Sequence, residues 1–144
     1  MIYLDTSFIA PFYISEATSE AVEAILLHLP PPELAISDWT VVEFASLLSR
    51  RGRMGELSAT LMQAAMQSFR EDADQSFNVF TVTIGDFQLA SELILQWETG
   101  LRAGDTLHLA IARNTHAAQI LSLDRGLIHA AQQFGIPADS GELA

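Results

Sequence analysis

The feature that most limits the fold of this chain is a regular alternation of short apolar runs with longer stretches of helical periodicity. The apolar runs are residues 2–5, 34–37, 77–82 and 119–123, and a short extended tail follows at 136–138. Runs of this length are typical of buried strands, whereas the stretches between them repeat their apolar side chains every three or four residues. Strands that alternate with helices form a parallel sheet with helices on both faces. We therefore predict an α/β fold with a central parallel sheet of four to five strands.

The predicted helices follow from the same pattern and from local end signals. They cover residues 16–29, 38–51, 57–74, 105–116 and 125–134. A further helix opens at Thr83, which forms a capping-box pattern with Asp86, and it carries Trp97 on its apolar face. Gly100 is expected to end this helix. Neither a repeat nor a linker interrupts the chain, so we predict one domain over residues 1–144.

The amino-acid composition limits the cell compartments in which the protein is expected to act. The chain has no cysteine, which excludes disulfides and thiolate metal sites and fits a reducing compartment. It also has no basic-then-apolar leader pattern and no apolar run of about 18 residues, the length needed to cross a membrane. We expect a cytoplasmic protein that has no membrane partner.

The charge balance limits how the chain could bind nucleic acid. It has 18 acidic residues and 7 basic ones, a formal net charge of −11, and every basic residue is an arginine. The absence of lysine excludes Schiff-base chemistry and a phosphate-binding loop lysine. A strongly negative chain does not bind phosphates by diffuse attraction. Any contact must therefore be local, through bound cations or through the cluster of Arg50, Arg51 and Arg53.

Four carboxylates are expected at one edge of the predicted sheet. Asp5 ends the first strand and Asp124 the fourth, Asp105 opens a helix, and Glu43 lies early in the helix after the second strand. The carboxyl ends of parallel strands meet at one edge, where sites form. Converging carboxylates repel one another unless a cation neutralises them, and Mg²⁺ binds carboxylates together with water and phosphate oxygens. The pattern predicts metal-assisted hydrolysis of a phosphodiester.

Each of these residues also has a purely structural interpretation. Asp105 and Asp124 are well placed to cap helices. Glu43 completes a capping-box pattern with Thr40, and on a helical wheel it lies opposite the apolar face, where a solvated acid is expected. Asp5 is the hardest to explain in this way, because the polar residues directly after it already supply caps.

Four short motifs, in order along nearly the whole chain, resemble the PIN domain and more narrowly its bacterial VapC-type toxin branch. They are YLDTS, VVEFASLL, LRAGDTLHLAIA and ILSLDRGL. The resemblance implies a three-layer α/β/α fold. It also implies that Asp5, Glu43 and Asp105 bind Mg²⁺, for which Mn²⁺ can substitute, and that Asp124 completes a metal-binding and catalytic acidic site.

The resemblance extends to two serines near this site. Ser7 matches the family's small hydroxyl residue after the first aspartate, which contacts a metal ligand or the substrate. Ser122 stands two residues before the last aspartate, where the family has threonine, so the hydroxyl is kept.

The function that the resemblance implies is a Mg²⁺-dependent endoribonuclease that hydrolyses RNA and is the toxic component of a toxin–antitoxin pair. A homodimer and a cognate antitoxin protein are implied as partners. One alternative is a catalytically inactive PIN-like module that binds RNA or a protein. A DNA substrate also stays open, since metal ions that clamp a phosphodiester do not read the 2′-hydroxyl. A phosphotransfer enzyme with Asp5 as its nucleophile fits poorly, because such sites need a second aspartate where Ser7 stands and a lysine.

Two further features are left undecided by the sequence. His108 lies one helical turn after Asp105, so its ring either approaches the acidic site or simply occupies a half-buried helix position. The three clustered arginines either guide RNA phosphates or form an ordinary charged turn.

Overall fold

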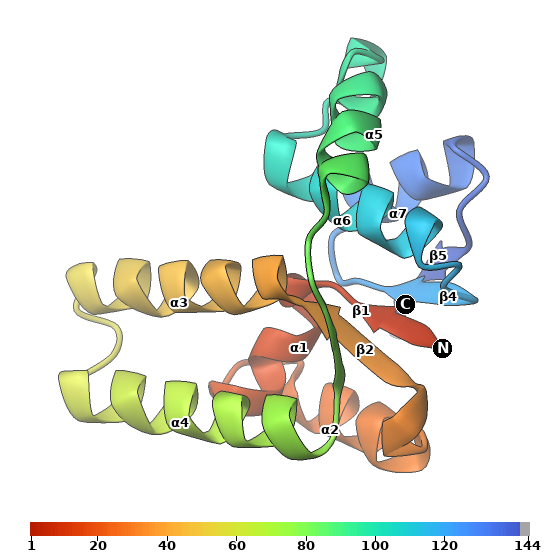
Figure 1. The fold of residues 1–144 in the computed structure, drawn as a ribbon. Helices are drawn as coiled ribbons and strands as arrows, with labels where there is room; N and C mark the ends of the chain where they lie inside the picture. Colours follow the sequence, from red (N-terminus) through yellow and green to blue (C-terminus); the bar gives the residue numbers. More distant parts are fainter. Residues whose placement is uncertain (142–144) are drawn as a thin grey trace.

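A parallel sheet forms the middle layer of the protein, whose computed structural model describes residues 1–141. Its strands are β1 (Ile2–Leu4), β2 (Leu34–Ser37), β3 (Asn78–Phe80), β4 (Gln119–Leu121) and β5 (Ala138–Asp139). They lie in the order β3-β2-β1-β4-β5, and every neighbouring pair is parallel (Figure 1). The predicted sheet is confirmed, with the tail strand at its edge. Residues 142–144 of the predicted domain lie outside the described residues.

Helices cover both faces of this sheet, as predicted (Figure 1). One face carries α1 (Thr6–Tyr13), α2 (Ser19–His28), α3 (Asp38–Arg53) and α4 (Ala59–Gln75), and the other carries α5 (Ile84–Ile94), α6 (Ala103–Asn114) and α7 (Arg125–Gln133). Side chains along a strand alternate between its two faces. On β1, Tyr3 therefore joins the core beneath α5–α7, and Leu4 joins the core beneath α1–α4. The three-layer α/β/α arrangement follows from this alternation.

Local capping signals fix where several helices begin. The hydroxyl of Ser37 accepts a hydrogen bond from the backbone of Thr40, and the Thr40 hydroxyl accepts one from the backbone of Ser37, so α3 begins directly after β2. Thr83 and Asp86 form the predicted capping box at the start of α5. Caps satisfy N–H groups that have no partner within the helix. These caps therefore fix the first turns of the helices at the edge of the sheet where the preceding strands end.

The helix predicted to carry Trp97 ends earlier than expected. α5 stops at Ile94, and the chain passes into a short 3₁₀ turn, η2 (Trp97–Thr99), which ends at Gly100 with φ of 68°. Leu95 and Trp97 are 77% and 78% exposed, so no core contact extends the helix past Ile94. Trp97 is thus a surface residue. A second 3₁₀ turn, η1 (Pro31–Glu33), joins α2 to β2 where the triple proline ends the helix.

No helix within residues 1–141 combines the length and apolarity needed to span a bilayer.

Candidate active site

Asp5 lies where the central strand gives way to a helix. It follows β1, caps the N-terminus of α1, and its backbone N–H donates to the carbonyl of Leu121 (3.0 Å). Its side chain is 5% exposed. A buried carboxylate is costly unless it is hydrogen-bonded or paired. The strand and the cap therefore hold this carboxylate at the sheet edge with little freedom to move.

Ser7 and Ser122 satisfy one oxygen of this carboxylate. The Ser7 hydroxyl donates to Oδ2 of Asp5 (2.5 Å), and the Ser122 hydroxyl donates to the same oxygen (2.8 Å). Each serine oxygen also accepts a backbone N–H from the loop after β4, from Leu123 and Asp124 respectively (both 3.0 Å). The structure thus places both predicted serines against Asp5, where they tie the end of β1 to the loop after β4.

Glu43 is not the solvated helix residue that its wheel position suggests. It lies in the second turn of α3, and its Oε1 accepts hydrogen bonds from the Thr6 hydroxyl (2.6 Å) and from Nε2 of His108. Burial by itself would raise the pKa of Glu43, but the hydrogen bond and charge of His108, with the Thr6 hydrogen bond, outweigh it and lower this pKa. The carboxylate is therefore ionised and held in place.

Asp124 is a helix N-cap, as its structural interpretation predicts, whereas Asp105 lies inside α6 and supports the start of that helix from within its first turn. Asp105 is the third residue of α6, and its Oδ2 accepts from the backbone of Arg102 (3.3 Å). Asp124 caps α7 through Oδ1, which accepts the backbone N–H groups of Gly126 (2.9 Å) and Leu127 (3.2 Å). Each capping contact uses one of the two carboxylate oxygens. Capping therefore does not exclude a second role for either residue.

The four predicted carboxylates line one cavity. This acidic cavity has a volume of about 270 Å³, and its walls also include Thr6, Ser7, Ser46, Leu47 and Arg50. Partial burial raises the pKa of Asp105; its backbone hydrogen bond opposes this, while the charges of Asp124, Asp5 and Glu43 add to it. Four carboxylates that face one cavity repel one another, so the charges of the other three disfavour ionisation of Asp105.

His108 completes the acidic cluster, although the sequence left its role open. Its ring is fully buried, Nδ1 lies 2.8 Å from the Tyr3 hydroxyl, and Nε2 contacts Glu43 and lies 3.4 Å from Oδ1 of Asp5. Burial would lower the pKa of His108, but Tyr3 and the carboxylates of Glu43 and Asp5 raise it to about 10. Ligand atoms of Asp5, Glu43 and His108 lie within 4.8 Å of one another, a group that could hold a metal ion.

The donor set of this cavity fits a hard divalent cation. It presents carboxylate oxygens, the ligands that Mg²⁺ and Mn²⁺ prefer, around a space large enough for water and substrate oxygens.

The predicted arginine cluster does not act as one unit. Arg50 lines the acidic cavity, whereas Arg51 pairs with Glu16 and Glu56, and Arg53 donates to Ser49 on its own helix. Helical geometry separates Arg50 from Arg51, because consecutive residues point in different directions around α3. Arg53 lies about one turn after Arg50 but is engaged by Ser49. Only Arg50 is thus placed to meet a phosphate at the cavity.

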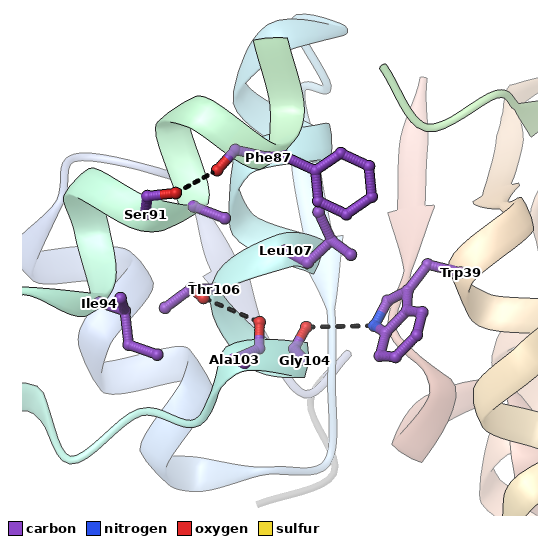
Figure 2. Close-up of a pocket in the computed structure, with 9 residues that line it drawn as sticks. Trp39, Phe87, Ser91, Ile94, Ala103, Gly104, Thr106 and Leu107 are labelled. Carbon is purple, nitrogen blue, oxygen red and sulfur yellow. Dashed lines mark hydrogen bonds between the residues drawn. The ribbon is translucent and has the colours of Figure 1, made fainter. Parts of the chain in front are cut away.

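A second, apolar pocket lies directly beside the acidic cavity. It has a volume of about 370 Å³ and lies between α5, the start of α6 and Trp39 (Figure 2). The Trp39 indole donates to the carbonyl of Gly104 (3.3 Å). A Cβ at Gly104 would lie 2.9 Å from Oε2 of Glu43 and 3.3 Å from the Trp39 ring. Gly104 therefore lies on the backbone between the two pockets, and a side chain there would require Glu43 to shift.

Comparison with known proteins identifies the family of this chain. The family model of the PIN domain matches residues 2–133. The chain belongs to the PIN domain family. A search of curated proteins found no significant relative.

Solved structures share this PIN fold at low sequence identity. VapC20 of Mycobacterium tuberculosis, described as a toxin that cleaves the sarcin–ricin loop, has a TM-score of 0.75 at 22% identity over 90% of this chain and 95% of that one. FitAcB from Neisseria gonorrhoeae has a TM-score of 0.72 at 20% identity over 100% of both chains. A toxin–antitoxin complex from Klebsiella pneumoniae has a TM-score of 0.63 at 18% identity over 98% of both chains. The sequence-based resemblance to the PIN family is confirmed.

Proposed function

We propose that this PIN protein is a metal-dependent endoribonuclease that hydrolyses phosphodiester bonds of RNA. The observation that carries the proposal is the convergence of Asp5, Glu43, Asp105 and Asp124 on one cavity, from four different segments of the chain. His108 offsets the charges of Glu43 and Asp5, and a bound cation would relieve the repulsion that remains among the four carboxylates. The description of VapC20 as a toxin that cleaves the sarcin–ricin loop supports a cleaving activity.

The four carboxylates would together hold Mg²⁺, or Mn²⁺ in its place. When bound, a divalent cation supplies positive charge that polarises a phosphodiester and makes a water molecule easier to deprotonate. The chain's own residues orient the reaction. Ser7 and Ser122 fix Oδ2 of Asp5, so that its Oδ1 faces the cluster. Arg50 at the cavity wall would bind a phosphate oxygen of the substrate.

Asp105 lies on the wall of this cavity, and burial together with the charges of Asp124, Asp5 and Glu43 raises the pKa of its carboxyl. A cation bound among these carboxylates would oppose those charges and favour the ionised form of Asp105. Asp105 would therefore act together with the other three carboxylates in holding the cation.

The biological role proposed is that of a toxin neutralised by a cognate antitoxin protein. Support comes from the similar structures, which include a toxin–antitoxin complex and FitAB bound to a DNA fragment. A homodimer, as the VapC-type resemblance implies, and action on RNA in the cytoplasm are parts of the same proposal.

The experiment is cleavage of total cellular RNA by antitoxin-free protein with Mg²⁺, with Mn²⁺ and with a chelator. Asp105→Asn is the test variant, and Asp86→Asn is its matched control, because Asp86 occupies the same capping-box position at the start of α5, outside the cavity. Discrete fragments that require metal and disappear only in Asp105→Asn are expected. No cleavage by metal-binding wild-type protein would favour the inactive binding module, and equal cleavage of single-stranded DNA would favour a less selective nuclease.

A further inference from the structure

A cluster of polar side chains is fully buried beneath the acidic cavity, in a core that is otherwise apolar. Tyr3, Ser37, Thr40 and His108 have no exposed surface, and Thr6 is almost completely buried. Apolar side chains of similar size would fill this space without needing hydrogen-bond partners. Stability alone therefore does not explain why polar groups occupy it.

The Tyr3 hydroxyl is the centre of this network. It lies 2.8 Å from Nδ1 of His108, 2.9 Å from the Ser37 hydroxyl and 3.5 Å from the Thr40 hydroxyl. Tyr3 belongs to β1, Thr40 to the first turn of α3, and His108 to α6, while Ser37 ends β2 and caps α3. The elements β1, α3 and α6 are the ones that present Asp5, Glu43 and Asp105 to the cavity. The network therefore links the supports of three of the four carboxylates.

His108 connects this centre to the carboxylates themselves. Its Nε2 contacts Oε1 of Glu43 and lies 3.4 Å from Oδ1 of Asp5. A carboxylate oxygen only accepts hydrogen bonds, so Nε2 carries the proton. Thr6 donates to the same oxygen of Glu43 (2.6 Å). Among the described residues, every buried polar side-chain atom has a partner, so the network is complete.

We propose that Tyr3 and His108 are positioning residues, which hold the carboxylates of Glu43 and Asp5 at a fixed separation so that the cation site is formed before the cation arrives. This inference rests on the proposed metal-dependent function. Without the Tyr3 hydroxyl the His108 ring loses the contact that sets its orientation, and Glu43 loses a fixed partner. Partners of this kind typically contribute a factor of about 10 to 100 in metal affinity.

The test compares Tyr3→Phe with Tyr13→Phe by calorimetric titration with Mn²⁺. Both variants remove one tyrosine hydroxyl with a buried or partly buried hydrogen bond, but Tyr13 bonds to Asp72 on α4, away from the cavity. We expect Mn²⁺ to bind Tyr3→Phe at least about tenfold more weakly than wild type, and Tyr13→Phe to match wild type. Equal Mn²⁺ affinity in all three proteins, each folded by circular dichroism, would overturn the inference.

A second pair of variants examines the ring directly. His108→Gln keeps an N–H donor for Glu43, whereas His108→Leu removes it, so the expected order of Mn²⁺ affinity is wild type, then glutamine, then leucine. Electron spin-echo spectra of bound Mn²⁺ should show no imidazole nitrogen coupling. Such a coupling would contradict the positioning role, because it would make His108 itself a ligand.

Failure of this inference is distinguishable from failure of the proposed function. Wild-type protein that binds Mn²⁺ but cleaves no RNA would refute the nuclease activity while the affinity series still stands. Cleavage by wild type, with no affinity difference between the two tyrosine variants, would refute the positioning role alone.

Discussion

Replacement of Gly104 by alanine should disturb the geometry of the acidic cavity while it changes the stability of the protein only a little. Gly104 is the second residue of α6, a position where alanine normally favours the helix, by up to about 1 kcal/mol. The added Cβ would lie 2.9 Å from Oε2 of Glu43, whereas ordinary contacts begin near 3.4 Å. The carboxylate must then move away by about 0.5 Å. Groups that bind a ligand usually have to be positioned to within about this distance.

The Glu43 carboxylate cannot withdraw without disturbing its own contacts. Its other oxygen is bound by Thr6 and His108, and the new Cβ also lies only 3.3 Å from the Trp39 ring. Loss of hydrogen bonds to a charged group costs about 1.5–3 kcal/mol, which offsets the helical gain. We expect the free energy of unfolding of Gly104→Ala to lie within about 2 kcal/mol of the wild-type value. Its Mn²⁺ affinity and its RNA cleavage should each be reduced about tenfold or more.

A matched control is available at the start of the neighbouring helix. Gly85 is the second residue of α5, and a Cβ there would meet only the Thr83 hydroxyl at an ordinary 3.6 Å. Gly85→Ala should therefore stabilise the protein slightly and leave Mn²⁺ binding unchanged. Chemical denaturation and calorimetric titration of both variants form the assay. If Gly104→Ala bound Mn²⁺ as tightly as Gly85→Ala, the claim that Gly104 keeps Glu43 in place would be wrong.

Three other predictions concern charge. Mg²⁺ or Mn²⁺ should raise the melting temperature of wild type but not of Asp5→Asn, since binding to the folded state alone stabilises it; an equal shift in both would place the cation elsewhere. The raised pKa of Asp105 means that its ionisation in the folded state costs stability as pH rises above about 3.8, so Asp105→Asn should melt higher than metal-free wild type at pH 7, with the gap closing in acid. Burial and the neighbouring Asp72 strongly raise the pKa of Tyr13 above its ordinary value of 10.0. The stability of the folded protein should therefore fall above pH 10, and it should fall less steeply in Tyr13→Phe. Melting curves at alkaline pH would test this.

The parts of the fold that local sequence encodes were predictable. The strand at 34–37 and the capping box at Thr83 have the bounds and contacts expected, because caps and apolar runs act over a few residues. The placement of Asp5 at the carboxyl end of a buried strand was also predictable, since parallel strands share that edge. Its roles in metal binding and catalysis, like those of the other three acids, stay predictions.

The parts that the sequence left undecided depend on contacts between distant segments. The contact between His108 and Glu43 joins residues 65 positions apart, and no periodicity reveals it. Glu43 was ambiguous for the same reason, because its helix alone places it on a polar face. The hydrogen bond that the Tyr13 hydroxyl donates to Asp72 (2.7 Å) likewise joins residues 59 positions apart. The only available signal for His108 was its position one turn after Asp105.

The pairing of the central strand has a consequence for when the acidic cavity forms during synthesis. β1 is made before the other strands of the sheet, but β4, its partner on one side, and Ser122, one of the two serines that bind Asp5, come more than 110 residues later. Contacts of such long sequence separation form late, after the intervening chain has been made. A nascent chain that has β1 but not β4 therefore carries Asp5 without the loop that orients it. The acidic cavity, and with it the proposed cation site, would be complete only after residues 119–124 have been synthesised.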